Sequence, residues 1–583
     1  MRIYLNTIPK TLSVLAVSAA IALTPLAPQA QILSDGRRHH PVSAAKHMVV
    51  SQEAQASLVG LEILRGGGNA VDAAVAVGFA LAVTLPRAGN IGGGGFMMIH
   101  MAQTGETVAI DYRELSPSAS DRDMFLDARG EASPQKSRFS GLAVGVPGTV
   151  AGLALAHEEF GSGNFTLAEL LAPAIALARD GFVVSPALKS ALENDFVRKR
   201  LEADPEAQSM FYPGGTVPEA GTRLPIPALA STLERIADDG PKGFYEGPVA
   251  EAIVATVNER GGRMTLEDLA NYTPVVREPV KGTFKDYEIF SMPPPSSGGV
   301  HLVQILNVLE GAPPASLGLN SAAMIHQMAE ASKYAYADRA LYLGDPDHVD
   351  VPIGPLTSKA YAAEISAKID PDRARPSAEI AASPDALPAE SDETTHYSVI
   401  DSEGNAVSNT YTLNFSFGVG FGAAGTGVLL NNELDDFSAK PGVPNAYGLV
   451  GGEANAVAPR KRPLSSMTPT IVLRDGAPYL ITGSPGGSRI ITTTLQVILN
   501  AIVHRRDIMT ATMAPRVHHQ WLPDYIRIEE GISDDTIRLL EGKGHEVKMQ
   551  SSMGSAQSIL VGPDGTLYGA SDLRRPGGLA AGD

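Results

Sequence analysis

The sequence predicts an α+β protein, with helices and strands before residue 371 and a strand-rich unit after residue 393. Three observations lead to this fold class. Apolar residues recur at helical spacing between residues 50 and 85, and apolar and polar residues alternate after residue 393. Between these regions, residues 371–393 are rich in proline, alanine and acidic residues without an apolar period, which is typical of a flexible tether.

The segment from residue 50 to 85 is predicted to form two helices. "QEAQASLVGLEILRGGG" has apolar residues at helical spacing, and its glycines at 66–68 mark a stop. "NAVDAAVAVGFALAV" follows, with Asn69 as its N-cap. This second helix is apolar on all faces but too short to cross a bilayer, so we expect it to be a buried central helix.

Further elements follow before the tether. "GNIGGGGFMMIH" leads from a glycine-rich turn into a strand. Residues 149–181 are predicted to form two more helices, because Thr166 and Glu169 match a capping box and Gly181 matches a C-terminal stop.

After the tether, the pattern predicts two β-hairpins. "THYSVID", "SEGN" and "AVSNTYTLN" indicate two strands with alternating faces joined by a turn. "QSILVGPDGTLYGAS" indicates a second hairpin around Pro563, Asp564 and Gly565.

Composition limits the class of protein. The chain has 583 residues, 44% of them hydrophobic and 19% charged, which indicates two to four globular domains or one large domain with insertions. The net charge of −18 argues against a nucleic-acid partner, because phosphates would be repelled. The absence of cysteine excludes disulfides, thiol nucleophiles and cysteine-based metal sites.

The first 30 residues resemble a secretory signal peptide. Arg2 and Lys10 supply a positive start, and residues 11–26 form a short apolar core. The core is shorter than the ~20 residues that a membrane span needs, which disfavours an uncleaved anchor. The small-residue cleavage pattern fits only loosely. We expect removal of residues 1–30, and a mature protein that is periplasmic or secreted and has no membrane span.

Several formal motifs are rejected on their context. "GFGAAG" at 420–425 matches a dinucleotide pattern, but no helix follows it. His157 starts a zinc-protease pattern, yet Gly161 stands where the second histidine belongs. "GSPGGSR" lacks the lysine of a nucleotide P-loop. His518 and His519 would face opposite ways on a strand, so a structural role is favoured over metal binding.

Two stretches have possible chemistry beside a plain structural meaning. "SPGGS" at 484–488 could converge its backbone N–H groups into a nest that holds an oxyanion, although the pattern alone favours a tight turn. "SDETTHYSVI" at 391–400 opens with a threonine pair where the tether becomes a strand, and threonine is common in strands.

A cut between Glu393 and Thr394 would give that threonine a free α-amine beside its own hydroxyl. An α-amine has a pKa of about 7.7–8.0, so it can act as a general base near neutral pH. Threonine activated by its own N-terminal amine is a known type of nucleophile. Before the cut the nitrogen is an amide without basicity, so the uncut chain would be inactive.

A series of long, colinear motifs resembles the gamma-glutamyltranspeptidase family over nearly all of the mature chain. These motifs are "GGGNAVDAAVA", "GNIGGGGFM", "DYRE", "GVPGTVAGL", "MPPPSSGGV", "TTHYSV", "TYTLN", "LLNNELDDFSAKPGVPNAYGLVGG", "KRPLSSMTPT" and "TGSPGGSRI". The resemblance implies an N-terminal-nucleophile hydrolase fold, which is a four-layer αββα sandwich. It also implies autocatalytic cleavage before Thr394 into a large subunit, 31–393, and a small subunit, 394–583, that stay together as a heterodimer.

The resemblance implies that glutathione and related γ-glutamyl compounds are the donors. The γ-glutamyl group would form an ester on Thr394 and pass to water or to amino acids and peptides, without a metal or organic cofactor. Thr412 would assist processing, and Gly486 and Gly487 would form the oxyanion hole.

The same resemblance assigns the substrate contacts. The α-carboxylate of the γ-glutamyl group would be held by Arg113, Ser465 and Ser466. Its α-ammonium would be held by Asn414, Glu433 and Asp436, and the family varies between Glu and Gln at position 433. A planar arginine and hydroxyl donors suit a carboxylate, and carboxylate and amide oxygens suit an ammonium. Residues 441–452 resemble a lid loop with Tyr447 as its gate.

Two other functions compete with this interpretation. A cephalosporin acylase of the same superfamily would cleave a glutaryl amide, which lacks the α-amine; Asp436 and the Tyr447 loop favour a γ-glutamyl substrate instead. A non-catalytic periplasmic binding protein for amino acids or peptides would need no cleavage.

Overall fold

The computed structural model describes residues 39–311, 314–381 and 393–583. Residues 41–583 form one compact unit. The predicted signal peptide lies outside the described residues. Among the described helices, none is both long and apolar enough to cross a membrane.

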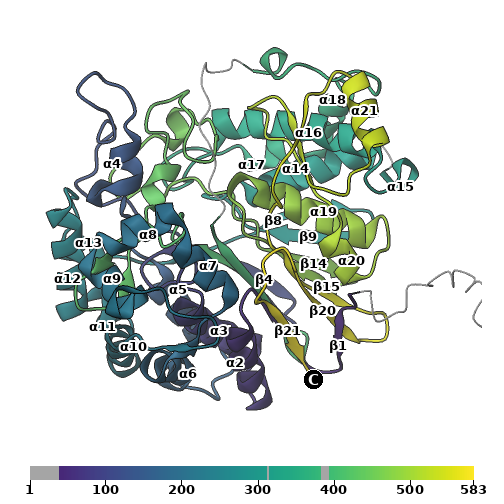
Figure 1. The fold of residues 1–583 in the computed structure, drawn as a ribbon. Coiled ribbons are helices and arrows are strands. Elements are labelled where there is room, and N and C mark those ends of the chain that lie inside the picture. Colours follow the sequence, from purple (N-terminus) through teal and green to yellow (C-terminus); the bar gives the residue numbers. More distant parts are fainter. Residues whose placement is uncertain (1–38, 312–313, 382–392) are drawn as a thin grey trace, which may run out of the picture. The chain divides into compact units, whose positions relative to one another are not determined.

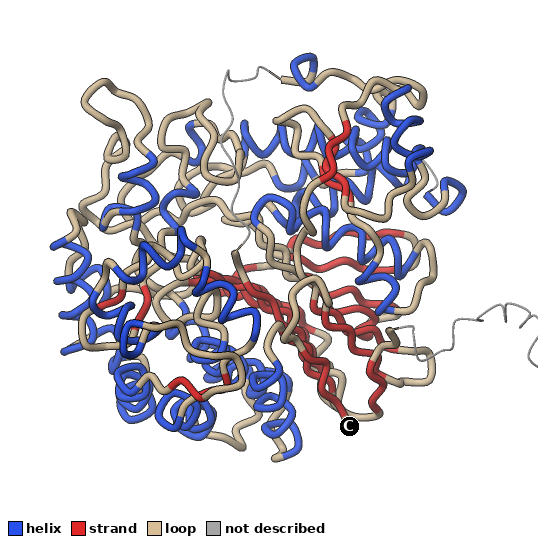
Figure 2. The backbone as a smooth tube through the Cα atoms, in the orientation of Figure 1, coloured by secondary structure: helices blue, strands red, loops and turns tan. Residues whose placement is uncertain are grey.

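Two seven-stranded antiparallel sheets form the centre of this unit (Figures 1 and 2). The first, which we call the nucleophile sheet, has the spatial order β21 (Leu579–Gly582), β2 (Met48–Ser51), β10 (Thr395–Ile400), β11 (Ala406–Thr412), β3 (Gly94–Met101), β4 (Glu106–Tyr112) and β7 (Val275–Arg277). The second, which we call the facing sheet, has the order β1 (Val42–Ala44), β20 (Leu567–Ser571), β19 (Gln557–Val561), β15 (Ala477–Thr482), β14 (Thr470–Arg474), β9 (Tyr287–Ser291) and β8 (Val280–Phe284).

The side chains of both sheets alternate between two apolar layers. Ile400 and Ile481 belong to a core between the sheets. Their neighbours Val399 and Leu480 belong to two other cores, which each sheet shares with helices. Successive strand residues point to opposite faces, so every strand at the centre is covered on both sides.

Helices cover the outer face of each sheet (Figure 1). The core outside the nucleophile sheet includes residues of α2 (Ala54–Arg65), α3 (Ala70–Thr84), α5 (Thr149–Phe160), α6 (Leu167–Asp180), α7 (Pro186–Glu193), α8 (Asp195–Glu202), α9 (Pro205–Phe211), α10 (Pro227–Asp239), α11 (Lys242–Tyr245), α12 (Gly247–Glu259) and α13 (Leu266–Ala270). The core outside the facing sheet includes residues of α14 (Gly298–Gly311), α16 (Ala322–Tyr342), α18 (Lys359–Ser366), α19 (Ile490–Ile502), α20 (Ile508–Met513) and α21 (Asp534–Gly542). The predicted four-layer αββα sandwich is confirmed.

Shorter elements complete the unit. The short helices are α4 (Pro134–Phe139), α15 (Pro314–Leu317) and α17 (Ile353–Leu356). The small sheets pair β5 (Phe182–Val183) with β6 (Arg223–Leu224), β12 (Gly422–Ala423) with β13 (Val428–Leu429), and β16 (Val517–His518) with β17 (Ile526–Ile528) and β18 (Val547–Met549).

The predicted local signals act as expected in the first half of the chain. Asn69 caps α3 in a capping box, and every residue of that helix is buried. Thr166 and Glu169 form the predicted capping box at the start of α6. The glycine-rich turn leads into β3, as predicted.

The two predicted hairpins form, but their surroundings differ from the alternating pattern. β10 pairs with β11, and β19 pairs with β20. Every residue of β10 and β11 is buried, including the polar ones. The cause is their central place: each strand lies between two neighbours and between two apolar layers. The strands after the tether therefore do not form a separate unit but complete sheets begun by earlier strands.

Part of the predicted tether is described and packed. Residues 371–381 contain a short 3₁₀ turn, in which Ser377 is buried. The backbone N–H of Ser377 donates to Asp524 at 2.7 Å, and its hydroxyl donates to the carbonyl of Trp521 at 2.6 Å. Residues 382–392 of the tether lie outside the described residues.

Candidate active site

Thr394 lies at the start of the central strand β10, beside the end of β11. Thr395 pairs with Tyr411 across the two strands, so Thr394 is brought next to Thr412. The hydroxyl of Thr394 donates to the carbonyl oxygen of Glu393 at 2.6 Å and to Oγ1 of Thr412 at 3.2 Å. Thr412 donates to the same carbonyl at 3.2 Å. The chain is continuous here, so this is the geometry of an uncut precursor.

The glycine run before β3 makes room for this junction. A Cβ on Gly93 would lie 2.2 Å from the carbonyl oxygen of Thr412, which is far inside van der Waals contact. A side chain at this position would therefore displace the end of β11. The motif "GNIGGGGFM" thus acts through close backbone packing against the strand that bears Thr412.

Gly486 and Gly487 stand where β15 gives way to a 3₁₀ turn and α19. Their φ angles are 131° and 56°, both in the region that favours glycine. In the part of the chain that the structure describes, neither backbone N–H donates to another group. The glycines nevertheless belong to a hydrogen-bonded 3₁₀ turn, because the backbone N–H of Arg489 donates to the carbonyl of Gly486 at 3.1 Å. This turn leaves both glycine N–H groups available to an oxyanion. Gly487 lines the same cavity as Thr394, whereas Gly486 does not line it.

Apart from Gly486, all the predicted site residues gather around that cavity. They are Thr394, Thr412, Gly487, Arg113, Asn414, Glu433, Asp436, Tyr447, Ser465 and Ser466. The cavity measures about 20 Å³, which is the space of a single water molecule. The site is therefore closed in this structure and must open to admit an amino acid.

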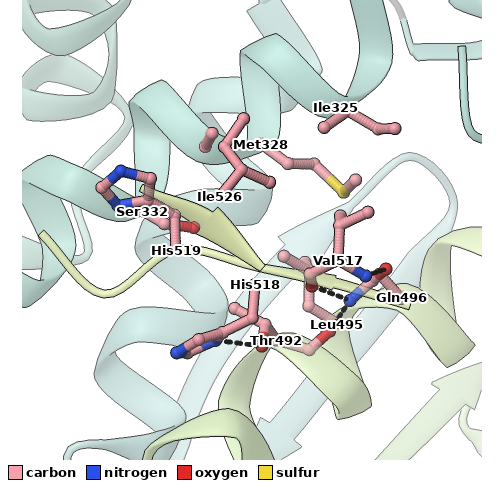
Figure 3. Close-up of a pocket in the computed structure, with 11 residues that line it drawn as sticks. Ile325, Met328, Ser332, Thr492, Leu495, Gln496, Val517, His518, His519 and Ile526 are labelled. Atoms are coloured by element: carbon pink, nitrogen blue, oxygen red, sulfur yellow. Dashed lines mark hydrogen bonds between the residues drawn. The ribbon is translucent and has the colours of Figure 1, made fainter. Parts of the chain in front are cut away.

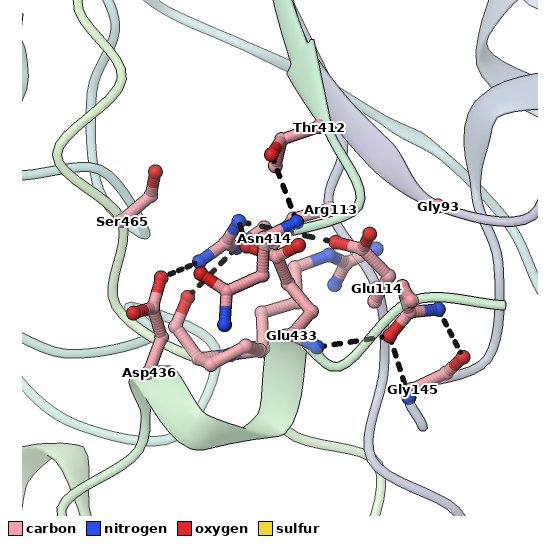
Figure 4. A network of polar contacts seen from close by, with 12 residues as sticks. Gly93, Arg113, Glu114, Gly145, Thr412, Asn414, Glu433, Asp436 and Ser465 are labelled. Atoms are coloured by element: carbon pink, nitrogen blue, oxygen red, sulfur yellow. Dashed lines mark hydrogen bonds and ion pairs between the residues drawn. The ribbon is translucent and has the colours of Figure 1, made fainter. Parts of the chain in front are cut away.

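Arg113, directly after β4, is the buried centre of the polar part (Figure 4). Its Nη2 donates to Oδ2 of Asp436 at 2.6 Å, and its Nη1 donates to Oε1 of Glu433. Its Nε donates to the carbonyl of Pro463 at 3.2 Å. Arg113, predicted to bind the α-carboxylate of the substrate, is thus paired with Glu433 and Asp436, which are predicted to bind its α-ammonium.

The buried carboxylates have raised pKa values. Burial raises the pKa of Glu114 to about 8, although Arg113 opposes the shift. Burial also raises the pKa of Glu433 and of Asp436. For Arg113, burial lowers the pKa, but the carboxylates of Glu433, Asp436 and Glu114 raise it above its usual value. The guanidinium is therefore charged, and Glu114 carries a proton at neutral pH.

Some polar atoms at this cavity are buried without a partner among the described residues. They are Oγ of Ser466 and the second oxygen of Glu433. Buried polar groups are normally hydrogen-bonded, so unpaired ones at a cavity are available to a ligand. Ser465 differs, because its Oγ accepts the N–H of Met467 at 3.0 Å.

The predicted lid loop, 441–452, closes the cavity from one side. The hydroxyl of Tyr447 donates to the backbone carbonyl of Asn414 at 2.9 Å and also contacts its side-chain oxygen. Asn445 donates to Oδ1 of Asp436 at 3.1 Å. A second cavity, of about 340 Å³, is lined by Val443, Pro444 and Asn445 of the loop, on the side of Asp435.

The paired histidines line a different pocket (Figure 3). His518 Nδ1 is 2.7 Å from the hydroxyl of Thr492, and its Nε2 is 2.8 Å from Oε1 of Gln520. Nδ1 of His519 accepts the N–H of Trp521 at 3.1 Å. These bonds join His518 of β16 to α19 and to Gln520, and His519 to Trp521.

One group in the described residues has metal-ligand types at close range: His326, Glu330 and His545. Nδ1 of His326 lies 2.7 Å from Nε2 of His545, which is a hydrogen bond. The ammonium of Lys333 lies 2.9 Å from Glu330. The group thus already holds a positive charge, and its contacts are those of a polar link between α16 and residue 545.

A model of the family described as gamma-glutamyltranspeptidase matches residues 56–582.

The chain belongs to the gamma-glutamyltranspeptidase family.

Relatives and solved structures agree with this membership. The glutathione hydrolase proenzyme of Escherichia coli (strain K12) is 55% identical over 544 residues, 93% of each chain. A cephalosporin acylase from Bacillus halodurans has a TM-score of 0.81 at 26% identity, covering 94% of this chain and 97% of its own. Helicobacter pylori gamma-glutamyltranspeptidase has a TM-score of 0.56 at 44% identity, covering 59% of this chain and 96% of the other. This gamma-glutamyltranspeptidase is an enzyme of the N-terminal-nucleophile hydrolase type, made as a self-processing precursor.

Several residues at or near the site of this gamma-glutamyltranspeptidase were not predicted from the sequence. Glu114 follows Arg113 in the quoted motif "DYRE", so its position beside the arginine could have been found. Asn445 lies in the predicted lid. Arg87 and Arg575 both contact Glu393, but no local pattern links them, because they meet only through the fold.

Proposed function

We propose that the chain is the precursor of a glutathione hydrolase that also transfers γ-glutamyl groups. The observation that carries this proposal is the hydroxyl of Thr394, 2.6 Å from the carbonyl oxygen of Glu393, at a cavity that contains a buried arginine and two carboxylates. The donors are glutathione and related γ-glutamyl compounds. The acceptors are water, amino acids and peptides, and the active form is a heterodimer of residues 31–393 and 394–583.

Self-cleavage begins at the hydroxyl of Thr394. Its oxygen attacks the carbonyl carbon of Glu393, the C–N bond breaks, and the hydroxyl proton ends on the nitrogen of Thr394. The product is an ester between Glu393 and Thr394. Water then attacks the ester carbon, and its proton returns to the threonine oxygen. The hydroxyl of Thr412, which donates to the Glu393 carbonyl, is placed to stabilise the oxyanion of both steps.

Turnover uses the groups that the cut creates. The new α-amine of Thr394 has an ordinary pKa of about 7.7–8.0, so it can accept the hydroxyl proton as the oxygen attacks a γ-carbonyl. The backbone N–H groups of Gly486 and Gly487 hold the tetrahedral oxyanion. The amine then protonates the leaving nitrogen, and a γ-glutamyl ester remains on Thr394. Water or an amino acid attacks this ester and releases the enzyme.

Substrate binding requires an exchange of ion-pair partners. The α-carboxylate of the donor replaces Glu433 and Asp436 on Arg113 and takes up the unpaired hydroxyl of Ser466. The α-ammonium takes the two carboxylates that are set free. Both charges of the donor thereby stay paired, which a buried site demands. The lid loop must move to allow this, and the cavity of about 340 Å³ beside it gives it room.

The test is a comparison of the full chain with Thr394→Ala. The wild-type chain should appear as two fragments in a denaturing gel, and the smaller fragment should begin Thr-Thr-His-Tyr. The variant should remain one chain and show no turnover of γ-glutamyl-p-nitroanilide. An uncut Thr394→Ala chain with activity would disprove the proposal, as would a small fragment with another N-terminus.

A cephalosporin-type acylase is the second candidate, since an acylase shares the fold at a TM-score of 0.81. Asp436 and its bond to Arg113 favour a substrate with an α-ammonium. Rates on γ-glutamyl and glutaryl anilides separate the two functions, and a glutaryl preference would favour the acylase. We also propose a periplasmic or secreted location, because residues 1–30 have the pattern of a signal peptide.

A further inference from the structure

The residue before Thr394 is held by two arginines from distant parts of the chain. Arg87 lies in the loop after α3, and its Nη2 binds Oε1 of Glu393. Arg575 lies between β20 and β21, and its Nη1 is 3.3 Å from Oε2 of Glu393. Each carboxylate oxygen therefore has its own arginine. One arginine belongs to the part before the cut and the other to the part after it.

Because the Glu393 carboxylate is buried, its ion pairs with Arg87 and Arg575 hold the side chain in one position. The side chain of Glu393 is only 12% exposed, and those of Arg87 and Arg575 are 21% and 18% exposed. A buried carboxylate must be paired, because leaving it without a partner is strongly unfavourable. Burial raises the pKa of Glu393, but the two arginines outweigh it and hold the pKa below its usual value. The side chain is therefore ionised and restricted to one position.

The restriction reaches the reacting atoms. Glu393 carries the carbonyl that Thr394 attacks, and that carbonyl accepts hydrogen bonds from the hydroxyls of Thr394 and Thr412 at 2.6 and 3.2 Å. Its side chain is anchored on one side of the backbone and β10 begins on the other. The carbonyl between these anchors has little freedom to rotate away. Attack inside a chain depends on such alignment, because a misplacement of about 1 Å can slow a reaction about 100-fold.

We propose that Arg87 and Arg575 form an anion subsite for the side chain of the residue before the scissile bond. Its ligand is the carboxylate of Glu393 in the uncut chain. The two arginines and the side chain of Glu393 are positioning groups for self-cleavage, and they do not touch the reacting atoms themselves. This inference rests on the self-cleavage proposed above.

The experiment follows cleavage of the purified full-length precursor over time, at pH 7, in five variants. Arg87→Gln, Arg575→Gln and Glu393→Gln should each cleave about 10- to 100-fold more slowly than the wild-type chain. Arg87→Lys keeps the charge and should recover part of the rate. The matched control is Arg65→Gln, which breaks an arginine–carboxylate pair with Asp583 elsewhere in the fold and should leave the rate unchanged.

A double variant separates positioning from a general structural role. If Arg87 acts through Glu393, Arg87→Gln combined with Glu393→Gln should be no slower than the slower single variant. Rates that multiply in the double variant would overturn the proposal, and so would single variants that cleave at the wild-type rate. Thermal melts identify variants that merely fail to fold, and for these Arg87→Lys and Glu393→Gln decide the outcome.

Two further readouts make the result specific. The rate of Arg87→Gln should fall as the pH is lowered from 7 to 5, because the carboxylate of Glu393 loses a partner that favours its ionised form. The wild-type rate should not fall in this way through Glu393, whose pKa lies below its usual value. Failure of the wild-type chain to cut before Thr394 would instead disprove the proposed function, so the two failures can be told apart.

Discussion

The protein's own groups occupy both ends of the site: the nucleophile end at Thr394 and the proposed γ-glutamyl end at Arg113. The contacts at these two ends are of different types. At the nucleophile end, the nitrogen of Thr394 is part of the peptide bond to Glu393, and the hydroxyl of Thr394 donates to the Glu393 carbonyl. At the other end, ion pairs join Arg113 to Glu433 and Asp436. The first can be removed only by breaking a covalent bond, whereas the second can be exchanged with a substrate at every turnover.

This difference assigns separate tasks to separate residues. Groups that contact the Glu393 carbonyl should govern how fast the precursor matures and should act once in the life of each molecule. Groups that contact Arg113 should govern donor affinity and selectivity in every cycle. Variants at the two ends are therefore expected to separate the cleavage rate from the turnover of mature enzyme.

The largest effect is expected at Thr412. Thr412→Val removes the hydroxyl that donates to the Glu393 carbonyl at 3.2 Å but keeps a similar shape. Loss of one oxyanion donor raises a barrier by about 2.7–4 kcal/mol, so self-cleavage should slow about 100- to 1,000-fold. Thr412→Ser keeps the hydroxyl and should cleave at a rate near that of the wild-type chain. Equal cleavage rates for the valine and serine variants would mean that the Thr412 hydroxyl does not take part in self-cleavage.

A smaller effect is expected at Asp436. Asp436→Asn keeps the shape but loses the charge that we propose pairs with the α-ammonium of the donor. A hydrogen bond to a charged group contributes about 1.5–3 kcal/mol, so kcat/KM for γ-glutamyl-p-nitroanilide should fall roughly 10- to 150-fold. Glutaryl-p-nitroanilide lacks the α-amine, and its kcat/KM should change little. A parallel loss with both substrates would mean that Asp436 does not recognise the ammonium.

Most of the fold could be predicted because local signals and the global architecture agree. The cap at Asn69, the glycine stop after α2 and the two hairpins are short-range features, and each forms as predicted. The strand-rich unit after the tether was only partly predicted. Its strands lie between strands of the earlier part, and strand order depends on long-range pairing that alternation does not encode.

The same division applies to the site. The motifs led to Thr394, Arg113 and the two glycines, because each lies in a short recognisable run. The ion pairs inside the cavity could not be predicted, since partner choice depends on burial and on how far the lid has closed. The contacts of Arg87 and Arg575 with Glu393 could not be predicted for another reason: these three residues are far apart in the sequence and are brought together only by the fold.

The smallest effect, and the one that tests the charge balance at the γ-glutamyl end, is expected from Glu114→Gln. The folded protein holds the proton of Glu114 up to about pH 8, whereas the ordinary value is 4.5. Between these pH values the folded state binds more protons than the unfolded state, so this group lowers stability as the pH rises. Glutamine cannot ionise. The melting temperature of Glu114→Gln relative to the wild-type chain should therefore rise from about pH 4.5 to pH 8 and then level off.

Glu158→Gln, at an exposed glutamate, sets the baseline for loss of a surface charge. A difference that stays constant from pH 5 to pH 9 would instead mean that Glu114 is ionised beside Arg113 throughout this range.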